Sequence, residues 1–191
     1  MKIGMIAVAV IFAFGEAGDA APQPGQDPRL NIAEDVISAF YAWDSDYLER
    51  AVAAGPDRDR VLYYQGWAKA ANYSVQKRYP CFIDSSDAVI CQVTVTDDFG
   101  RTLGYTATDT FTLSIMNGSV VALSSEGDDP QIFWDLIAWI TETRPEIMEG
   151  PCHNYFSGGT TPGACAEAVV ESASIFLDLP DSRLLFEKKK K

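Results

Sequence analysis

The chain has 191 residues, of which 47% are hydrophobic and 22% charged, a composition typical of one globular domain rather than a disordered chain. Its 27 acidic residues outnumber its 15 basic residues and give a formal net charge of -12. Because affinity for phosphate backbones comes mainly from Lys and Arg, this excess of acid argues against binding to nucleic acid.

The N-terminus has the pattern of a secretory signal peptide. Lys2 is followed by an uncharged apolar run that ends at Phe14, and then by small residues. The run is shorter than the roughly twenty apolar residues that a membrane span needs. We place cleavage after Ala20, with the stretch 13–15 as second choice. A buried N-terminal helix is the alternative interpretation.

The expected organisation is a signal peptide at 1–20, a Pro-rich linker at 21–30, one domain at 31–180 and a basic tail at 181–191 that ends in four lysines. No later stretch is apolar enough to cross a bilayer. We therefore expect a soluble, secreted or periplasmic protein with no membrane span after signal cleavage.

The first part of the domain is predicted to be helical. A helix capped by Asn31 carries apolar residues at helical spacing through Trp43. A second short helix, capped by Asp44 or Ser45, stops at Gly55, and a third is expected from about Arg58 to Ala71.

A period of two residues then predicts four antiparallel strands. Segments 73–83 and 88–97 form a hairpin, and a longer connection at 98–104 leads to strand 107–116. Asn117-Gly118 is a strong signal for a tight turn into the last strand, 119–125. In strand 107–116, Phe111, Leu113 and Ile115 share the face predicted to be buried.

Two helices are expected to follow the sheet. Asp129 is predicted to cap the first, with Pro130 at its first position, an apolar stripe lying on the sheet, and Pro145 ending it. Thr161 is predicted to cap the second, with Pro162 at its first position.

Export makes two disulfides the natural interpretation of the four cysteines. If residues 85–87 form the hairpin turn, Cys81 lies opposite Cys91 at a distance that a bridge can span. Cys152 is then left to pair with Cys165. The alternative is a metal site, but the spacings are not C-x2-C and His153 is the only histidine.

The order of elements is similar to the α+β cone of the nuclear transport factor 2-like (SnoaL-like) superfamily, a cystatin-like fold in which N-terminal helices pack on a curved antiparallel sheet with C-terminal helices. It most resembles a group of mostly exported bacterial members. The matching residues are Trp67, Cys81, Cys91, Asp97, Asp98, Phe99, Arg101, Leu103, Gly104, Asp109, Thr110, Phe111, Thr112, Asn117 and Gly118. One departure is that segment 51–58 shows no pattern for the short strand that many members carry there.

The resemblance implies a cavity on the concave side of the sheet, which in this superfamily serves both enzymes and non-catalytic binders. Asp109 is the candidate catalytic base, because its strand face would turn it into that cavity. The alternative places Asp109 at a wet rim, paired with Arg101. The expected ligand pocket residues are Tyr63, Tyr64, Trp67, Phe111 and Leu113, and the alternative for Tyr64 and Trp67 is a place in the core.

Two functions therefore stay open. The first is an exported, non-catalytic module that binds a small apolar ligand or a partner segment. The second is a cofactor-free isomerase, cyclase or dehydratase that uses a pocket carboxylate as base. Asp97, Asp98, Asp128 and Asp129 match no calcium-loop pattern, so we interpret them as solvated loop carboxylates rather than ligands of a cation. No cofactor or metal is expected, and a homodimer is left open.

Overall fold

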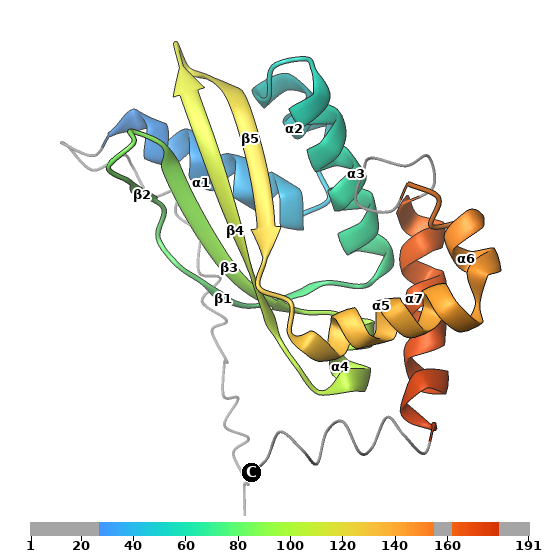
Figure 1. Ribbon diagram of the computed structural model, residues 1–191. Coiled ribbons are helices and arrows are strands. Elements are labelled where there is room, and N and C mark those ends of the chain that lie inside the picture. Colours follow the sequence, from blue (N-terminus) through green and yellow to red (C-terminus); the bar gives the residue numbers. More distant parts are fainter. Residues whose placement is uncertain (1–26, 155–161, 180–191) are drawn as a thin grey trace, which may run out of the picture.

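The computed structural model describes residues 27–154 and 162–179, which form an α+β arrangement of helices around a curved, open antiparallel sheet (Figure 1). The helices are α1 (Pro28–Tyr41), α2 (Ser45–Ala51), α3 (Pro56–Ala70), α4 (Asp98–Leu103), α5 (Gln131–Thr143), α6 (Pro145–Glu149) and α7 (Pro162–Leu177). The strands are β1 (Ser74–Arg78), β2 (Phe82–Ile83), β3 (Val89–Thr96), β4 (Ala107–Met116) and β5 (Ser119–Gly127). The predicted signal peptide, most of the predicted linker, the predicted cap Thr161 and the predicted basic tail lie outside the described residues.

The sheet has the order β1-β3-β4-β5, with β2 also paired to β3. All of these pairs are antiparallel. Asn117 and Gly118 both have positive φ, 52° and 80°, as a tight turn between β4 and β5 requires. The predicted meander is therefore present.

The first predicted strand, 73–83, is wrong as one continuous element, because the structure divides it into β1 and β2. Pro80 lies in the break, where its missing N–H cannot join a ladder. Phe82 pairs with Ile90, in the predicted register, whereas Arg78 pairs with Val93, one residue out of it. The sheet consequently has five strands instead of four.

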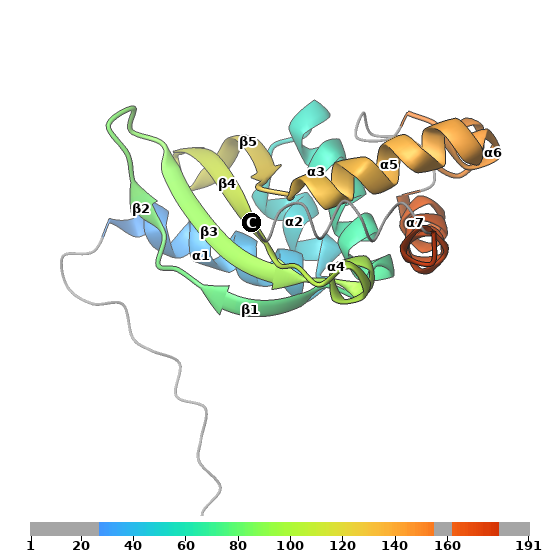
Figure 2. The same cartoon turned by 60° about the horizontal axis from the view of Figure 1, so that its bottom comes forward.

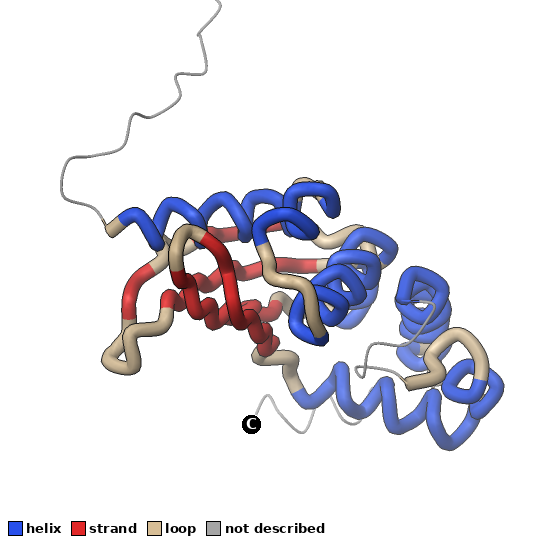
Figure 3. The backbone as a smooth tube through the Cα atoms, turned by 90° about the horizontal axis from the view of Figure 1, so that it is seen from above, coloured by secondary structure: helices blue, strands red, loops and turns tan. Residues whose placement is uncertain are grey.

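The helices α1, α2 and α3 lie along one face of the sheet, as Figures 2 and 3 show from two directions. The core between them, which we call the sheet cluster, consists of Ala33, Val36, Ile37, Ala39, Phe40, Leu48, Val52, Val61, Ala68, Cys81, Val89, Cys91, Val93, Val95, Phe111, Leu113, Ile115, Val120 and Leu123. The prediction that Phe111, Leu113 and Ile115 are buried is confirmed. The predicted disulfide between Cys81 and Cys91 is also confirmed.

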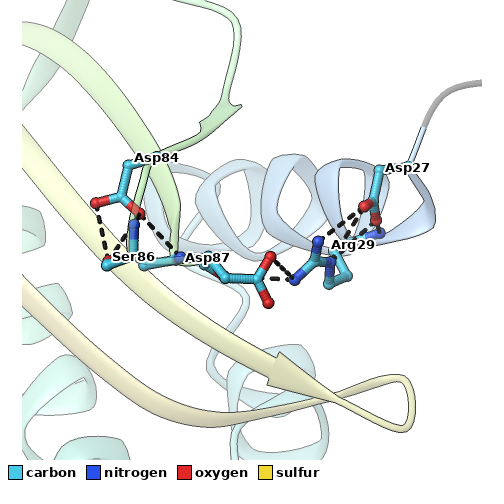
Figure 4. Close-up of polar contacts among 6 residues, drawn as sticks. Asp27, Arg29, Asp84, Ser86 and Asp87 are labelled. Carbon is cyan, nitrogen blue, oxygen red and sulfur yellow. Dashed lines mark hydrogen bonds and ion pairs between the residues drawn. The ribbon is translucent and has the colours of Figure 1, made fainter.

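Helix α1 begins at Pro28, so the predicted start at Asn31 is wrong. Asp27 caps the helix by accepting a hydrogen bond from the Arg29 amide at 2.9 Å, and Pro28 takes the first position, which does not need an N–H. The Arg29 guanidinium also forms ion pairs with Asp27 at 2.9 Å and with Asp87 at 3.0 Å (Figure 4). Since Asp87 lies in the turn between β2 and β3, this contact joins α1 to the hairpin.

A second core, which we call the helix cluster, lies beyond one end of the sheet (Figure 1). It consists of Trp67, Ala71, Phe99, Leu103, Phe133, Leu136, Ile140, Ile147, Cys152, Cys165, Ala166, Val169, Ala173 and Phe176. The apolar stripe of α5 belongs here and packs against α7 and α4, so the prediction that it lies on the sheet is wrong. The predicted disulfide between Cys152 and Cys165 is confirmed and joins α7 to the segment after α6.

Helix α5 also starts differently from the prediction. Its N-cap is Pro130, which has extended backbone angles and provides no capping side chain. Asp129 therefore lies one residue too early to cap the helix, and its carboxylate is available for another role. The short helix α6 follows directly after Arg144, where only an end to α5 was expected.

Helix α3 is the wall that the two clusters share, because Ala68 belongs to the sheet cluster and Trp67 to the helix cluster. Its close approach to α7 depends on Gly66, where an added Cβ would lie 3.1 Å from Pro162 Cγ. Segment 51–58 forms no strand, but Ala53 donates a backbone hydrogen bond to Val120 at 2.8 Å, so this segment does touch β5. Within the described ranges, no helix is long and apolar enough to cross a membrane.

Candidate functional site

A pocket of about 370 Å³ lies where the sheet cluster meets the helix cluster. Eight of the fourteen residues that line it are aromatic, and three carry a side-chain carboxylate. The lining consists of Phe40, Tyr64, Trp67, Ala68, Tyr73, Phe99, Asp109, Phe111, Ser125, Glu126, Gly127, Asp129, Phe133 and Trp134. Its size lies within the range of small-molecule sites.

The aromatic side chains come from both clusters. On the sheet side, the rings of Phe40 and Phe111 meet edge to face with centroids 5.2 Å apart. On the helix side, Phe99 stacks on Phe133 at 5.5 Å and meets Trp67 at 6.0 Å. These ring contacts fix one another, so both walls of the pocket are pre-formed.

Asp109 is the most buried carboxylate of the pocket wall and lies on β4. Its Oδ2 accepts a hydrogen bond of 2.5 Å from the hydroxyl of Tyr41, a residue of α1. Burial raises the pKa of Asp109 to about 7, although the Tyr41 hydrogen bond acts in the opposite direction. Arg101 does not pair with it and instead binds Asp98 at 2.5 Å, so the alternative of a wet Asp109 paired with Arg101 is wrong.

Asp129 is the second half-buried carboxylate of the pocket. Burial, together with the neighbouring charge of Asp128, raises its pKa to about 6. A Cβ added at Gly127 would lie 3.0 Å from Asp129 Oδ2 and 3.6 Å from Asp109 Oδ1. The absence of a side chain at Gly127 therefore leaves the space that separates the two carboxylates open.

The prediction that Asp97 is a solvated loop carboxylate is wrong, because this residue is only 4% exposed. It caps α4 by accepting a hydrogen bond from the Gly100 amide at 2.5 Å. Burial raises its pKa to about 7, against the effect of that hydrogen bond. The interpretation holds better for Asp128, which is exposed and accepts a hydrogen bond from the Thr108 amide.

Three tyrosines surround these carboxylates. Burial is the main cause that raises the pKa of Tyr41, Tyr73 and Tyr105, so all three keep their hydroxyl proton in the physiological range. The Tyr41 hydroxyl donates a hydrogen bond to Asp109. Among the described residues, the buried hydroxyl of Tyr105 has no hydrogen-bond partner.

Of the predicted site residues, Asp109, Tyr64, Trp67 and Phe111 line one pocket. Leu113 lies outside its lining and is fully buried in the sheet cluster. Tyr63 also lies outside the lining, buried edge to face against the ring of Tyr64 at 5.7 Å.

The sequence reasoning missed Asp129, Tyr73, Phe99, Phe133 and Trp134 as pocket residues. Phe99 and Phe133 follow the acidic pairs 97–98 and 128–129, and the sequence pattern identifies these pairs only as loop carboxylates. A useful signal is the recurrence of two adjacent aspartates near the start of a helix that carries an aromatic residue.

Within the part of the chain that the structure describes, no group of three or more His, Cys, Asp or Glu side chains could hold a metal ion. Comparison with known proteins gives no match, whether to a protein-family model, to a curated protein or to a solved structure.

Proposed function

We propose that this protein is an exported module of the nuclear transport factor 2-like type that binds a small molecule without transforming it. The observation that carries the proposal is the pocket of about 370 Å³ with aromatic walls from two separate cores. A pre-formed apolar pocket with few polar groups is the usual form of a small-molecule site. The two disulfides fit the oxidising compartment that export implies.

The test uses a neutral apolar fluorophore, N-phenyl-1-naphthylamine, and two substitutions on neighbouring residues of β5. Ser125 lines the pocket, whereas Ser124 is exposed and lies on the other face of the strand. Ser125→Phe should fill the pocket and abolish the fluorescence gain on titration, while Ser124→Phe should keep it. Circular dichroism should show both variants folded. Equal binding by the two variants would contradict the proposed site.

A second candidate function is a cofactor-free isomerase, cyclase or dehydratase, and the geometry of Asp109 is the observation that favours it. The hydrogen bond from Tyr41 engages Oδ2, so Oδ1 is the oxygen that can receive a proton from a substrate. A base is most effective when its pKa lies near the working pH, and burial raises the pKa of Asp109 to about 7.

This alternative is tested with an aryl ketone that has acidic α-protons, such as 2-tetralone, in heavy water. As a base, Asp109 would take an α-proton to leave the enolate and, after exchange with solvent, return a deuteron. Proton NMR should then show exchange above the uncatalysed rate with the native chain and not with Asp109→Asn. A binder would show no excess exchange with either protein.

A further inference from the structure

The charge of the pocket points to its ligand. Three of the lining residues are acidic, Asp109, Glu126 and Asp129, and none is Arg, Lys or His. Neither Asp109 nor Asp129 forms an ion pair within residues 27–154 and 162–179. A half-buried carboxylate without a cationic partner carries a desolvation cost that a bound cation would offset.

The carboxylates also act on one another. The charge of Asp129 raises the pKa of Asp109, and the charge of Asp128 raises the pKa of both. Gly127 leaves open the space that both pocket carboxylates border. A single positive charge placed there would interact favourably with the two of them at once.

The aromatic walls of the pocket also suit a positively charged ligand. Aromatic ring faces attract ammonium groups, and the indole of tryptophan does so most strongly. Two tryptophans line the pocket, and Trp134 keeps 43% of its surface exposed, so an indole is accessible from solvent. The remaining aromatic wall is apolar and can accommodate a hydrocarbon body.

We propose that the pocket selects an organic cation, a quaternary or protonated amine attached to an apolar body, with the positive charge beside Asp109 and Asp129. This inference rests on the proposed binding function and specifies its ligand class. An organic cation fits better than a metal ion, because aromatic rings are poor metal ligands and the described carboxylates form no metal-binding group. The net charge of -12 would also attract cations from solution.

The test compares benzyltrimethylammonium with neopentylbenzene, its neutral carbon isostere, by displacement of N-phenyl-1-naphthylamine from the full chain. The two ligands have nearly the same shape, so their affinity ratio reports the charge alone. We expect the cation to bind about tenfold more tightly or better, as a desolvated cation over aromatic rings and carboxylates implies. The quaternary amine does not titrate, so its charge is constant at every pH.

Substitutions of the pocket carboxylates test whether the preference for the cation arises in the pocket. Asp109→Asn and Asp129→Asn should each reduce the affinity ratio severalfold while neopentylbenzene still binds, because Asn keeps the shape and removes the charge. The control is Asp87→Asn, which makes the same charge change in the β2–β3 turn (Figure 4) and should leave the ratio unchanged. Using two pocket variants covers the case in which one of them fails to fold.

Each outcome has a definite meaning. Equal or tighter binding of neopentylbenzene would overturn the inference about charge while the binding function stands. The inference would also be overturned if Asp87→Asn lowered the affinity ratio as much as Asp109→Asn does. The preference for the cation would then come from the overall charge of the protein and not from the pocket. If neither ligand nor the fluorophore binds, the proposed function fails together with the inference.

Discussion

The sheet cluster and the helix cluster are held together by different kinds of contact. Strands β3, β4 and β5 of the sheet cluster are joined by ladders of backbone hydrogen bonds, with a register shift between Ser114 and Ile115 in the β4–β5 pair. Among the described residues, α5 and α7 of the helix cluster pack together without a backbone hydrogen bond between them, and the disulfide between Cys152 and Cys165 joins α7 to the segment after α6. The helix cluster should therefore open more easily, and the pocket, which takes one wall from each cluster, should change shape from its helix side.

The largest expected effects come from equal truncations in the two clusters. Leu113 and Leu136 are both fully buried, the first in the sheet cluster and the second in the helix cluster. Leu113→Ala and Leu136→Ala should each lower the free energy of unfolding by about 2 to 5 kcal/mol. Chemical denaturation measures this, and a loss below about 1 kcal/mol would mean that the site is not core.

The same two variants test the proposed difference in local stability. Leu136→Ala should speed hydrogen exchange in α5 and α7 while the β3–β4 ladder stays protected, because the clusters meet along α3 and at Tyr73 rather than interpenetrating. Leu113→Ala should speed exchange in both clusters. Identical exchange patterns would show that the two clusters unfold as one unit.

The next effect is the loss of each disulfide. Both close short loops, with sequence separations of 10 and 13 residues, so each should contribute about 3 kcal/mol by the chain-entropy relation. Replacing Cys152 and Cys165 by Ala should loosen α7 selectively. Replacing Cys81 and Cys91 by Ala is the matched control, because it should leave α7 protected from hydrogen exchange. Mass spectrometry of hydrogen exchange, resolved by peptide, distinguishes the two results.

The two clusters also differ in how far the sequence predicts them. The buried face of β4 follows from alternation alone, because a strand has two faces and Phe111, Leu113 and Ile115 can share only one. The bridge between Cys81 and Cys91 follows from the geometry of a hairpin. These features depend on neighbours in the chain, and the structure confirms them.

The partner of α5 could not be predicted in this way. Its apolar stripe identifies a buried face, but periodicity does not say whether that face meets the sheet or another helix. Asp129 was missed for the same reason, since its place in the pocket depends on where Gly127 and β4 lie in space. Of the candidate site, the sequence therefore predicted the sheet-side wall, with Asp109 and Phe111, better than the helix-side wall, with Phe133 and Trp134.

A moderate effect is expected on the pH dependence of stability. The pKa of Asp109 is raised to about 7 from an ordinary value of 3.8, so the folded state binds this proton more tightly than the unfolded state. The resulting stabilisation is fully present below about pH 4 and is lost as the pH rises to about 7. Tyr41, Asp128 and Asp129 act on the same group and define its surroundings.

Asp109→Asn should remove this part of the pH dependence, because Asn does not titrate. At pH 8 the variant should be more stable than the native chain by about 1 to 3 kcal/mol, while at pH 4 the two should be nearly equal. Asp129→Asn should act in the same direction but over a window that ends near pH 6, where its own pKa lies. Thermal melts at several pH values measure both. Parallel stability curves for the variant and the native chain would contradict the assignment.

The smallest effect should come from Tyr41→Phe, which removes only the hydroxyl that binds Asp109 Oδ2 at 2.5 Å. That hydrogen bond lowers the pKa of Asp109, so its loss should move the pKa further above 7. Burial raises the pKa of Tyr41, so the tyrosine is still a donor at pH 9, when Asp109 is ionised. The loss of stability should be about 1 kcal/mol and larger at pH 9 than at pH 5, because hydrogen bonds to charged groups are the stronger ones. Carbon-13 NMR of the aspartate carboxyl groups follows the titration of Asp109 directly. An unchanged midpoint in Tyr41→Phe would show that the sheet-side wall sets the pKa of Asp109 by burial alone, without the hydroxyl that α1 supplies.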